Sequence, residues 1–213
     1  MTSGQQLSRS GGLFVISAPS GAGKTSLVKA LLERNPQLTV SVSHTTRPPR
    51  PSELSGREYW FVTPQEFQER LARGEFLEHA QVFDNFYGTG RATVEAVLNA
   101  GRDVILEIDW QGARQVRESA PGCTTIFILP PSRAALEERL RNRQTDTPEV
   151  IARRLRDAVG DMSHYREFGY VVVNDDFDTA CGQLECILTG KGQALTSDRP
   201  QLAPLLADLL GSA

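Results

Sequence analysis

One segment near the amino terminus, residues 13–29 (LFVISAPSGAGKTSLVK), constrains the fold of this chain more than any other. It starts with a short apolar, partly β-branched run, Leu13–Ser17, which predicts a strand buried on both faces of a sheet. A glycine-bearing loop follows over residues 18–25, and apolar residues then recur at helical spacing until Asn35-Pro36. This order of strand, loop and helix is the one that a phosphate-binding P-loop needs.

The residues of the loop suit a nucleotide phosphate. Gly21 and Gly23 let the backbone curl so that successive N–H groups point inward. Lys24 adds a cation, and Thr25 offers a hydroxyl to Mg²⁺. The first position of the usual pattern G-x-x-x-x-G-K-[ST] is an alanine here. An ordinary loop can match this pattern by chance, but the flanking strand and helix favour phosphate binding. We expect the loop to contact a nucleotide through Ala18, Pro19, Ser20, Gly21, Ala22, Gly23, Lys24, Thr25 and Ser26.

Composition limits the class of protein. The chain has 213 residues, 39% of them hydrophobic and 23% charged, which is ordinary for one compact soluble unit. The net charge of −3 gives no reason to expect nucleic acid or a membrane as a partner. Three cysteines without a C-x-x-C pair, no apolar run of transmembrane length and no signal peptide favour the cytoplasm.

Strands separated by helices predict an α/β fold built on a parallel sheet. Core strands are expected at Leu13–Ser17, 39–43, 104–109, 124–129 and 170–173. Prolines are expected to break all regular structure from His44 to Pro51. After them we expect a strand in the aromatic run at 59–62, a helix over 64–73 and a further strand over 75–86. Residues 43–91 therefore predict a small insertion on the core.

Four residues stand where core strands end, and parallel sheets bind ligands at that edge. These residues are Ser17, Asp109, Pro130 and Asn174. Asp109 is the expected carboxylate for Mg²⁺ and its waters, although it could equally cap the next helix. Glu107, flanked by apolar residues, is expected to face a charged site. The run Asp109–Gly112 also matches the D-x-x-G pattern of GTPases, but no guanine-reading N-K-x-D motif accompanies it.

Several further runs, in their order and spacing, resemble the guanylate kinases. They are APSGAGKT (18–25), SHTTRPPR (43–50), EFLEHAQV (75–82), LEIDWQGA (106–113) and VNDD (173–176), with Glu58-Tyr59 and Tyr87-Gly-Thr89 between them. The resemblance covers residues 12–190. It implies a P-loop NTPase-type parallel sheet flanked by helices, an inserted small α+β GMP-binding subdomain and a helical lid.

The implied organisation is a flexible N-terminus (1–11), a guanylate kinase-like domain (12–190) and a C-terminal tail (191–213). Within the domain we expect a core (12–42, 92–131 and 157–190), a GMP-binding insertion (43–91) and a lid (132–156). The tail holds one amphipathic segment, 204–210, whose leucines could pack on the body or on a partner. No motif lies in it, so we expect catalysis without it.

The resemblance also implies which residues surround GMP: Ser43, Arg47, Arg50, Tyr59, Glu78, Tyr87 and Thr89, with Glu107 and Asp109 beside them. Asn174 is expected to contact ATP. Mg²⁺ is expected at Thr25 and Asp109, partly through water. The catalytic residues are expected to be Lys24, Arg47, Arg143 and Arg154. Gln144 stands where the family commonly has glycine, which leaves the geometry of the lid turn open.

The chemistry of these side chains agrees with the resemblance. A 5′-phosphate needs planar, permanently charged partners such as Arg47 and Arg50, and phenolic donors such as Tyr59 and Tyr87 can add to them. Guanine shows adjacent N1–H and N2–H₂ donors, and one carboxylate, Glu78, can accept from both. The hydroxyls of Ser43 and Thr89 can answer O6 or N7. Solvated arginines and a surface glutamate remain the plain alternative.

Six arginines flank residues 144–147, and most of them could be a solvated, salt-bridged surface. The resemblance selects Arg143 and Arg154 as arms that close over the transferred phosphoryl group.

The sequence thus predicts an enzyme of purine nucleotide metabolism that phosphorylates GMP, and dGMP, with Mg-ATP as the phosphoryl donor. Two alternatives stay open: a guanylate-kinase-like binding or scaffold module without catalysis, and a kinase for another nucleoside monophosphate. A homo-oligomer is possible.

Overall fold

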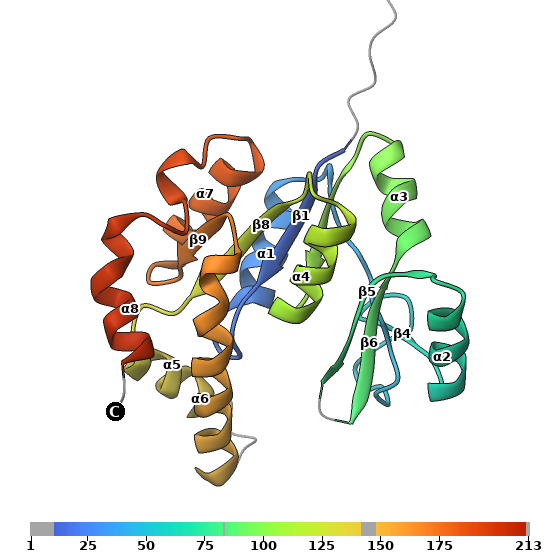
Figure 1. Ribbon diagram of the computed structural model, residues 1–213, viewed down its shortest axis with the longest axis horizontal. Helices are drawn as coiled ribbons and strands as arrows, with labels where there is room; N and C mark the ends of the chain where they lie inside the picture. Colours follow the sequence, from blue (N-terminus) through green and yellow to red (C-terminus); the bar gives the residue numbers. More distant parts are fainter. Residues whose placement is uncertain (1–10, 83, 142–147, 212–213) are drawn as a thin grey trace, which may run out of the picture.

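The computed structural model describes residues 11–82, 84–141 and 148–211, and Figure 1 shows their arrangement. Five parallel strands form a central sheet in the order β2-β7-β1-β8-β9. Their bounds are Leu38–Val40 (β2), Asp103–Glu107 (β7), Leu13–Ser17 (β1), Thr124–Leu129 (β8) and Tyr170–Val173 (β9). The α/β fold class with a parallel sheet is confirmed.

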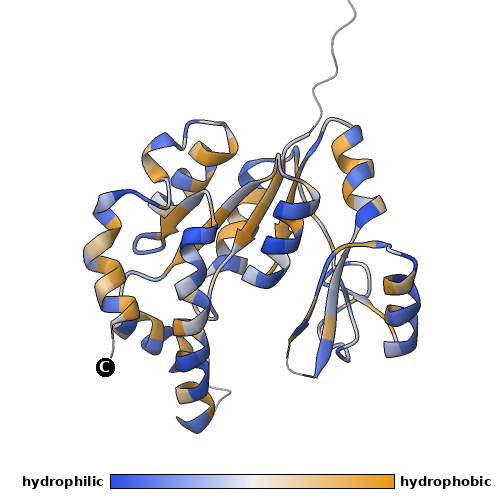
Figure 2. Ribbon diagram, viewed as in Figure 1, coloured by the Kyte–Doolittle hydropathy of each residue, from blue (hydrophilic) through white to orange (hydrophobic). Residues whose placement is uncertain are grey.

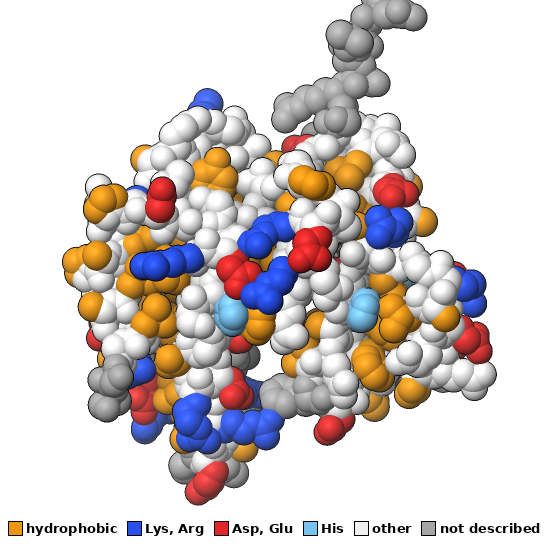
Figure 3. Space-filling view, in the orientation of Figure 1, with side chains coloured by type: hydrophobic (Ala, Val, Ile, Leu, Met, Phe, Trp, Pro, Cys, Tyr) orange, Lys and Arg blue, Asp and Glu red, His pale blue; other side chains and the backbone are white. Residues whose placement is uncertain are grey.

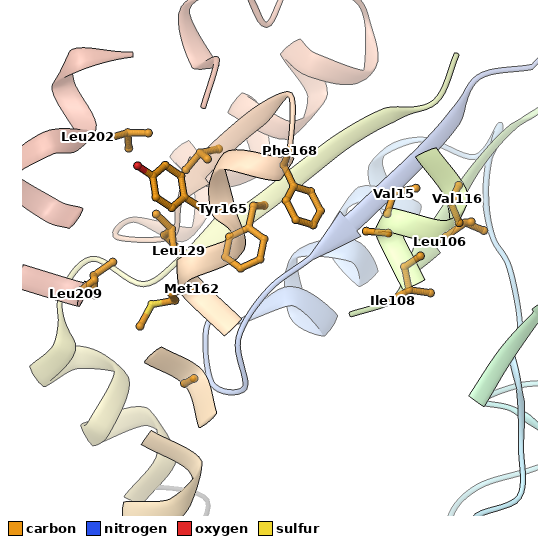
Figure 4. Packing of buried hydrophobic residues seen from close by; sticks show 14 of the residues in the cluster. Val15, Leu106, Ile108, Val116, Leu129, Met162, Tyr165, Phe168, Leu202 and Leu209 are labelled. Carbon is orange, nitrogen blue, oxygen red and sulfur yellow. The ribbon is translucent and has the colours of Figure 1, made fainter. Parts of the chain in front are cut away.

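Helices cover both faces of this sheet, and its strands are the most continuously apolar part of the chain (Figure 2). One face packs Phe14 and Ile16 against Leu27 and Leu184, which come from α1 (Lys24–Arg34) and α7 (Phe177–Leu188). The other face packs against α4 (Trp110–Ser119), α6 (Pro148–Met162) and α8 (Ala203–Leu210) (Figure 4). Because the strands are buried on both sides, their carboxyl ends are the part of the sheet left open to a ligand.

A second sheet of four strands, in the order β4-β3-β6-β5, lies beside the core. Its strands are Trp60–Phe61 (β4), His44–Thr45 (β3), Asn85–Gly90 (β6) and Phe76–Val82 (β5). Helix α2 (Pro64–Ala72) covers it through Phe67, whose ring stacks on Phe76 at 4.5 Å between centroids. Helix α3 (Arg91–Asn99) then leads back to the central sheet.

Three local expectations need correction. The strand expected over 39–43 is β2 at Leu38–Val40, and His44–Thr45, expected to lack regular structure, forms β3. The first proline of that run comes only at position 48, so the two residues of β3 keep the backbone N–H groups that strand pairing needs. The strand expected over 75–86 is a hairpin of β5 and β6, with the chain turning at Asp84-Asn85 as expected.

Two helices stand where the lid is expected: α5 (Arg133–Arg141) and the first turns of α6. Arg143 and Gln144 lie outside the described residues, as do residues 1–10 of the expected flexible N-terminus. After α6 the chain forms a 3-10 helix, η1 (Ser163–Glu167).

The tail packs on the body of the protein. After two 3-10 helices, η2 (Gln193–Leu195) and η3 (Pro200–Leu202), helix α8 sets Leu209 into the same core as Met162 and Leu129 (Figure 4). Leu209 is fully buried, and the carboxylate of Asp208 accepts a hydrogen bond from the backbone N–H of Arg133 at 3.0 Å. The leucines of 204–210 therefore meet the body, and the tail belongs to its core.

Candidate active site

The loop after β1 has the geometry of an anion-binding turn. Gly21 and Gly23 have φ values of 90° and 94°, which favour glycine, and Gly23 begins α1 without any side-chain cap. The first N–H groups of α1 are therefore available to a phosphate. Asn174 stabilises the loop from the end of β9, because its buried side-chain amide donates to the carbonyl of Ala22 at 2.8 Å.

Lys24 opens α1 and reaches across the carboxyl edge of the sheet. Its Nζ donates to the backbone carbonyl of Ile108 at 3.3 Å. Burial lowers the pKa of Lys24, and the nearby carboxylates, Glu107 and Asp109 foremost, act in the opposite direction. The ammonium group is therefore held over a strongly acidic part of the site. The side chain of Thr25, next in the helix, is exposed.

A cavity of about 230 Å³ joins the two sheets at this point. From the core it is lined by Lys24, Glu107 and Asp109, and from the second sheet by Ser43, Tyr59, Glu78 and Tyr87. Residues expected to touch a phosphate and residues expected to touch guanine thus face one space, although they come from elements far apart in the sequence.

Glu78 lies on β5 and is only 3% exposed. Its Oε1 accepts a hydrogen bond from the hydroxyl of Thr89 at 2.6 Å, and that hydroxyl lies 3.2 Å from the hydroxyl of Ser43. Burial raises the pKa of Glu78 to about 7, and the hydrogen bond from Thr89 opposes this shift. Glu78 is therefore not a solvated glutamate on the surface, which was the plain alternative for this residue.

An adjoining cavity of about 410 Å³ extends from Lys24 and Tyr59 to Arg50. Arg47 does not line this cavity, but its guanidinium lies 5.5 Å from the ring centroid of Tyr59 and donates to Glu53 at 2.9 Å, and both of these residues do. Glu53 also accepts from the backbone N–H of Arg50 at 2.8 Å, and these bonds hold the pKa of its carboxyl below its usual range. Sequence reasoning missed Glu53, because an acidic residue in a proline-rich run carries no local signal of a partner six residues away.

Asp109 follows β7 and caps the next helix, as one of the two interpretations of it expects. Its Oδ1 accepts from the N–H of Gly112 at 2.8 Å and so caps α4, while the carboxylate also lines the 230 Å³ cavity. Burial raises the pKa of Glu107, which Lys24 counteracts. Glu107 is therefore a partly buried acid beside the site, as its apolar neighbours indicated.

Among the arginines of α5 and α6, Arg154 lies at a cavity, whereas Arg139 holds two elements together. Arg154 lines a cavity of about 380 Å³ with Ser20, Asp109 and Asp161. Basic side chains also gather at the end of α6 that follows the undescribed residues (Figure 3). Arg139, by contrast, donates to the carbonyl of Asn174 at 2.9 Å and holds α5 to the end of β9.

Sequence reasoning also missed Asp161, on α6. Burial raises its pKa to about 6, and the indole N–H of Trp110 donates to it. The ring of Trp110 stacks on His164 of η1 at 3.5 Å between centroids, so the residue after Asp109 is packed against the base of α6. No local pattern marks Asp161, since an acidic residue on a helix usually faces solvent.

Comparison with known proteins places the chain among close relatives. The sequence model of a family described as guanylate kinase matches residues 10–191. The guanylate kinases of Methylococcus capsulatus and Alkalilimnicola ehrlichii are 59% and 58% identical to this chain, over 93% and 94% of it and 98% and 99% of their own length. A crystal structure of guanylate kinase from Anaplasma phagocytophilum is 34% identical, has a TM-score of 0.71, and covers 93% of this chain and 95% of its own.

Proposed function

This chain belongs to the guanylate kinase family, and on that premise we propose that it transfers the γ-phosphoryl group of ATP to GMP, giving GDP and ADP. The single observation that carries the proposal is that Glu78 and Lys24 line one cavity. A buried acceptor for guanine and a cation for the transferred phosphate then stand at the two ends of one acceptor site.

Guanine recognition rests on the buried carboxylate of Glu78. Guanine N1–H and N2–H₂ donate to its two oxygens, and the hydroxyl of Thr89 holds it in place at 2.6 Å. Ser43, within hydrogen-bond distance of Thr89, answers O6 or N7. These contacts are all made to the guanine base, and the arginines contact the phosphate. None of them involves the ribose, so dGMP should be accepted as well.

The 5′-phosphate of GMP is bound by Arg47, Arg50, Tyr59 and Tyr87. The rings of Tyr59 and Tyr87 lie 5.9 Å apart, edge to face, and both residues line the 230 Å³ cavity. Arg47 is only partly exposed and is paired with Glu53, which lines the 410 Å³ cavity, so its guanidinium is held beside that cavity before any phosphate binds. Preorganised guanidinium groups of this kind bind a phosphate with little loss of side-chain entropy.

The phosphates of ATP are bound by the loop of residues 18–25 and the N-terminus of α1. Lys24 and Arg154 neutralise charge on the γ-phosphoryl group, and Asn174 acts on ATP through the loop that it supports. No side chain has to form a covalent bond, since the acceptor oxygen of GMP is aimed in line. The alternative of a binding module without catalysis does not require the uncapped α1 terminus or Lys24.

The residues present fit Mg²⁺. Thr25 offers an exposed hydroxyl, and Asp109 keeps one carboxylate oxygen beyond the one that caps α4. In the described part of the chain no group of three or more His, Cys, Asp or Glu side chains could hold a metal by itself. This suits a cation held partly by water and by the nucleotide. When bound, Mg²⁺ neutralises charge on the β- and γ-phosphates.

A cytoplasmic location is supported by the state of the thiols. Cys123, Cys181 and Cys186 are all free, which suits a reducing compartment. Separately, no helix among the described residues is long and apolar enough to cross a bilayer.

The test is a coupled assay of ADP formation with ATP, Mg²⁺ and, in turn, GMP, dGMP, AMP, CMP and UMP. We expect turnover with GMP and dGMP and little with the others. Faster turnover with another monophosphate would assign the enzyme to that substrate. Tight GMP binding without ADP formation would favour the binding module.

A further inference from the structure

The outer edge of β5 is the point where the second sheet meets the core. β5 ends the order β4-β3-β6-β5, and no described strand pairs with its free side. Unpaired backbone groups at such an edge are costly when they are shielded from water. At His79, next to Glu78, a side chain of α4 takes the place of the missing strand.

That side chain is Gln115. Its Nε2 donates to the carbonyl of His79 at 2.7 Å, and its Oε1 accepts from the N–H of the same residue at 3.0 Å. A primary amide is the side chain that can supply both bonds at once, because it carries a donor and an acceptor side by side. Gln115 therefore pairs with β5 as a strand residue would, across 36 positions of the sequence.

Helix α4 also approaches Glu78 directly, one turn before Gln115. A Cβ atom at Gly112 would stand 2.5 Å from Oε2 of Glu78. The backbone of α4 thus closes one side of the carboxylate, while Thr89 binds its other oxygen. Only glycine leaves room for Glu78 in its observed position.

The strand itself is irregular at this point. Phe76 pairs with Gly90 and Glu78 with Thr89, so Leu77 is an extra residue in β5. Such a bulge changes the direction of the next side chain, and the disrupted strand needs other contacts to keep its conformation. Leu77 packs into the core with Val94 and Val116, and Gln115 holds the backbone on the other side of Glu78.

We propose that Gln115 is a positioning residue for guanine recognition, whose amide holds the bulged strand β5 against α4 and so fixes the carboxylate of Glu78 in the GMP cavity. The inference rests on the proposed function. Gln115 does not line the cavity itself, so it acts on the substrate only through Glu78.

The test replaces Gln115 by methionine, which keeps the length and removes both hydrogen bonds. Gln68→Met, at an exposed glutamine of α2, is the matched control. For Gln115→Met we expect the KM for GMP to rise about tenfold, with kcat and the KM for ATP within about twofold of the parent. The preference for GMP over IMP, which lacks the N2 amino group, should fall as well.

A double-mutant cycle tests whether Gln115 acts through Glu78. In a Glu78→Gln background, Gln115→Met should add little to the KM for GMP, because the carboxylate that it positions is already lost. Additive effects would overturn the inference. So would an unchanged KM for GMP, or an equal rise in the KM values for GMP and ATP.

If Gln115→Met does not fold, Gly112→Ala gives a second test. The Cβ of alanine should displace the buried carboxylate of Glu78 and raise the KM for GMP, while the preference of a helix for alanine over glycine offsets part of the cost to stability. Gly182→Ala, at a helical glycine of α7 with open space around it, is the control. An unchanged KM in Gly112→Ala would overturn the inference. If the parent enzyme itself does not phosphorylate GMP, the proposed function fails instead.

Discussion

The side-chain amide of Asn174 donates to the backbone carbonyl of Ala22 at 2.8 Å and joins residues that are 152 positions apart. Asn174 is 5% exposed, and its own carbonyl accepts from Arg139. The end of β9, the last turn of α5 and the phosphate-binding loop are therefore one hydrogen-bonded unit. A loop held in this way keeps its N–H groups aimed before ATP binds, which is how positioning contributes to phosphoryl transfer.

Glu78→Gln should weaken GMP binding selectively. The change replaces one acceptor oxygen by an amide that faces a donor of guanine, which should cost about 2–4 kcal/mol in kcat/KM for GMP. AMP presents an acceptor at N1, so the GMP-to-AMP preference should shrink from both directions, while the KM for ATP should hardly change. The measurement is kcat/KM for GMP and AMP at saturating Mg-ATP. An unchanged ratio would remove Glu78 from guanine recognition.

Lys24→Met should lower kcat by at least about two orders of magnitude, because the ammonium group stabilises charge on the transferred phosphoryl group. Glu107 and Glu78 lose a nearby cation that lowers the pKa of both carboxyls, so each should hold its proton more tightly in the variant. Circular dichroism and the GMP dissociation constant, measured beside kcat, separate catalysis from folding and binding. Near-normal phosphorylation by a folded variant would contradict the P-loop assignment.

Arg154→Ala should depress kcat far more than it raises the KM for GMP, since its contact strengthens only as charge develops in the transition state. Arg153→Ala is the matched control, because the neighbouring side chain is exposed and pairs with Asp157 at 3.8 Å. If both variants kept the parent kcat, Arg154 would belong with the solvated arginines of α6.

GMP binding should depend on pH through Glu78. Burial raises its pKa from 4.5 to about 7, and the carboxyl must be ionised to accept from both guanine donors. The KM for GMP should therefore rise as the pH falls below about 7, up to about tenfold per pH unit, while Glu78→Gln should lack this dependence. A flat KM between about pH 6 and 8 would contradict the assignment.

The raised pKa of Glu78 also makes folding stability depend on pH, but here the contribution falls as the pH rises. The folded carboxyl binds its proton more tightly than the unfolded one, so its contribution to the unfolding free energy is present below about pH 4.5 and is lost as the pH rises towards 7. Without ligand, Glu78→Gln should therefore gain stability relative to the parent between these values, which urea denaturation at two pH values measures.

Leu209→Ala tests whether the tail belongs to the core. Leu209 is fully buried in the same core as Met162 and Leu129, so shortening its side chain to alanine should cost about 2–5 kcal/mol of unfolding free energy. Gln201→Ala, at an exposed tail residue, should cost little. At low temperature kcat should stay near the parent value, since none of the described tail residues, 191–211, lines the GMP cavity. Equal melting temperatures for both variants would contradict the packing of α8. Removal of residues 191–213 should accordingly destabilise the enzyme, which the absence of motifs did not indicate.

Features encoded by short-range patterns could be predicted from the sequence. The strand Leu13–Ser17 agrees with β1 to the residue, because a run of apolar side chains flanked by a glycine loop admits few other structures. The segment Thr124–Leu129 agrees with β8 in the same way. The bounds of β2 and β3 could not be predicted, since their pairing with β7 and β6 decides where each strand ends.

The sequence by itself determined the phosphate loop, the alternation of strands and helices, and which residue types could meet a nucleotide, because local backbone preferences and periodicity carry that information. Only the tertiary structure decided that Gln115 pairs with His79, that Glu53 holds Arg47, and that Leu209 completes the core. Each of these depends on which surfaces the folded chain brings together. A glutamine or a leucine has the same local pattern whether it faces a partner or the solvent, so its role appears only when the packing is known.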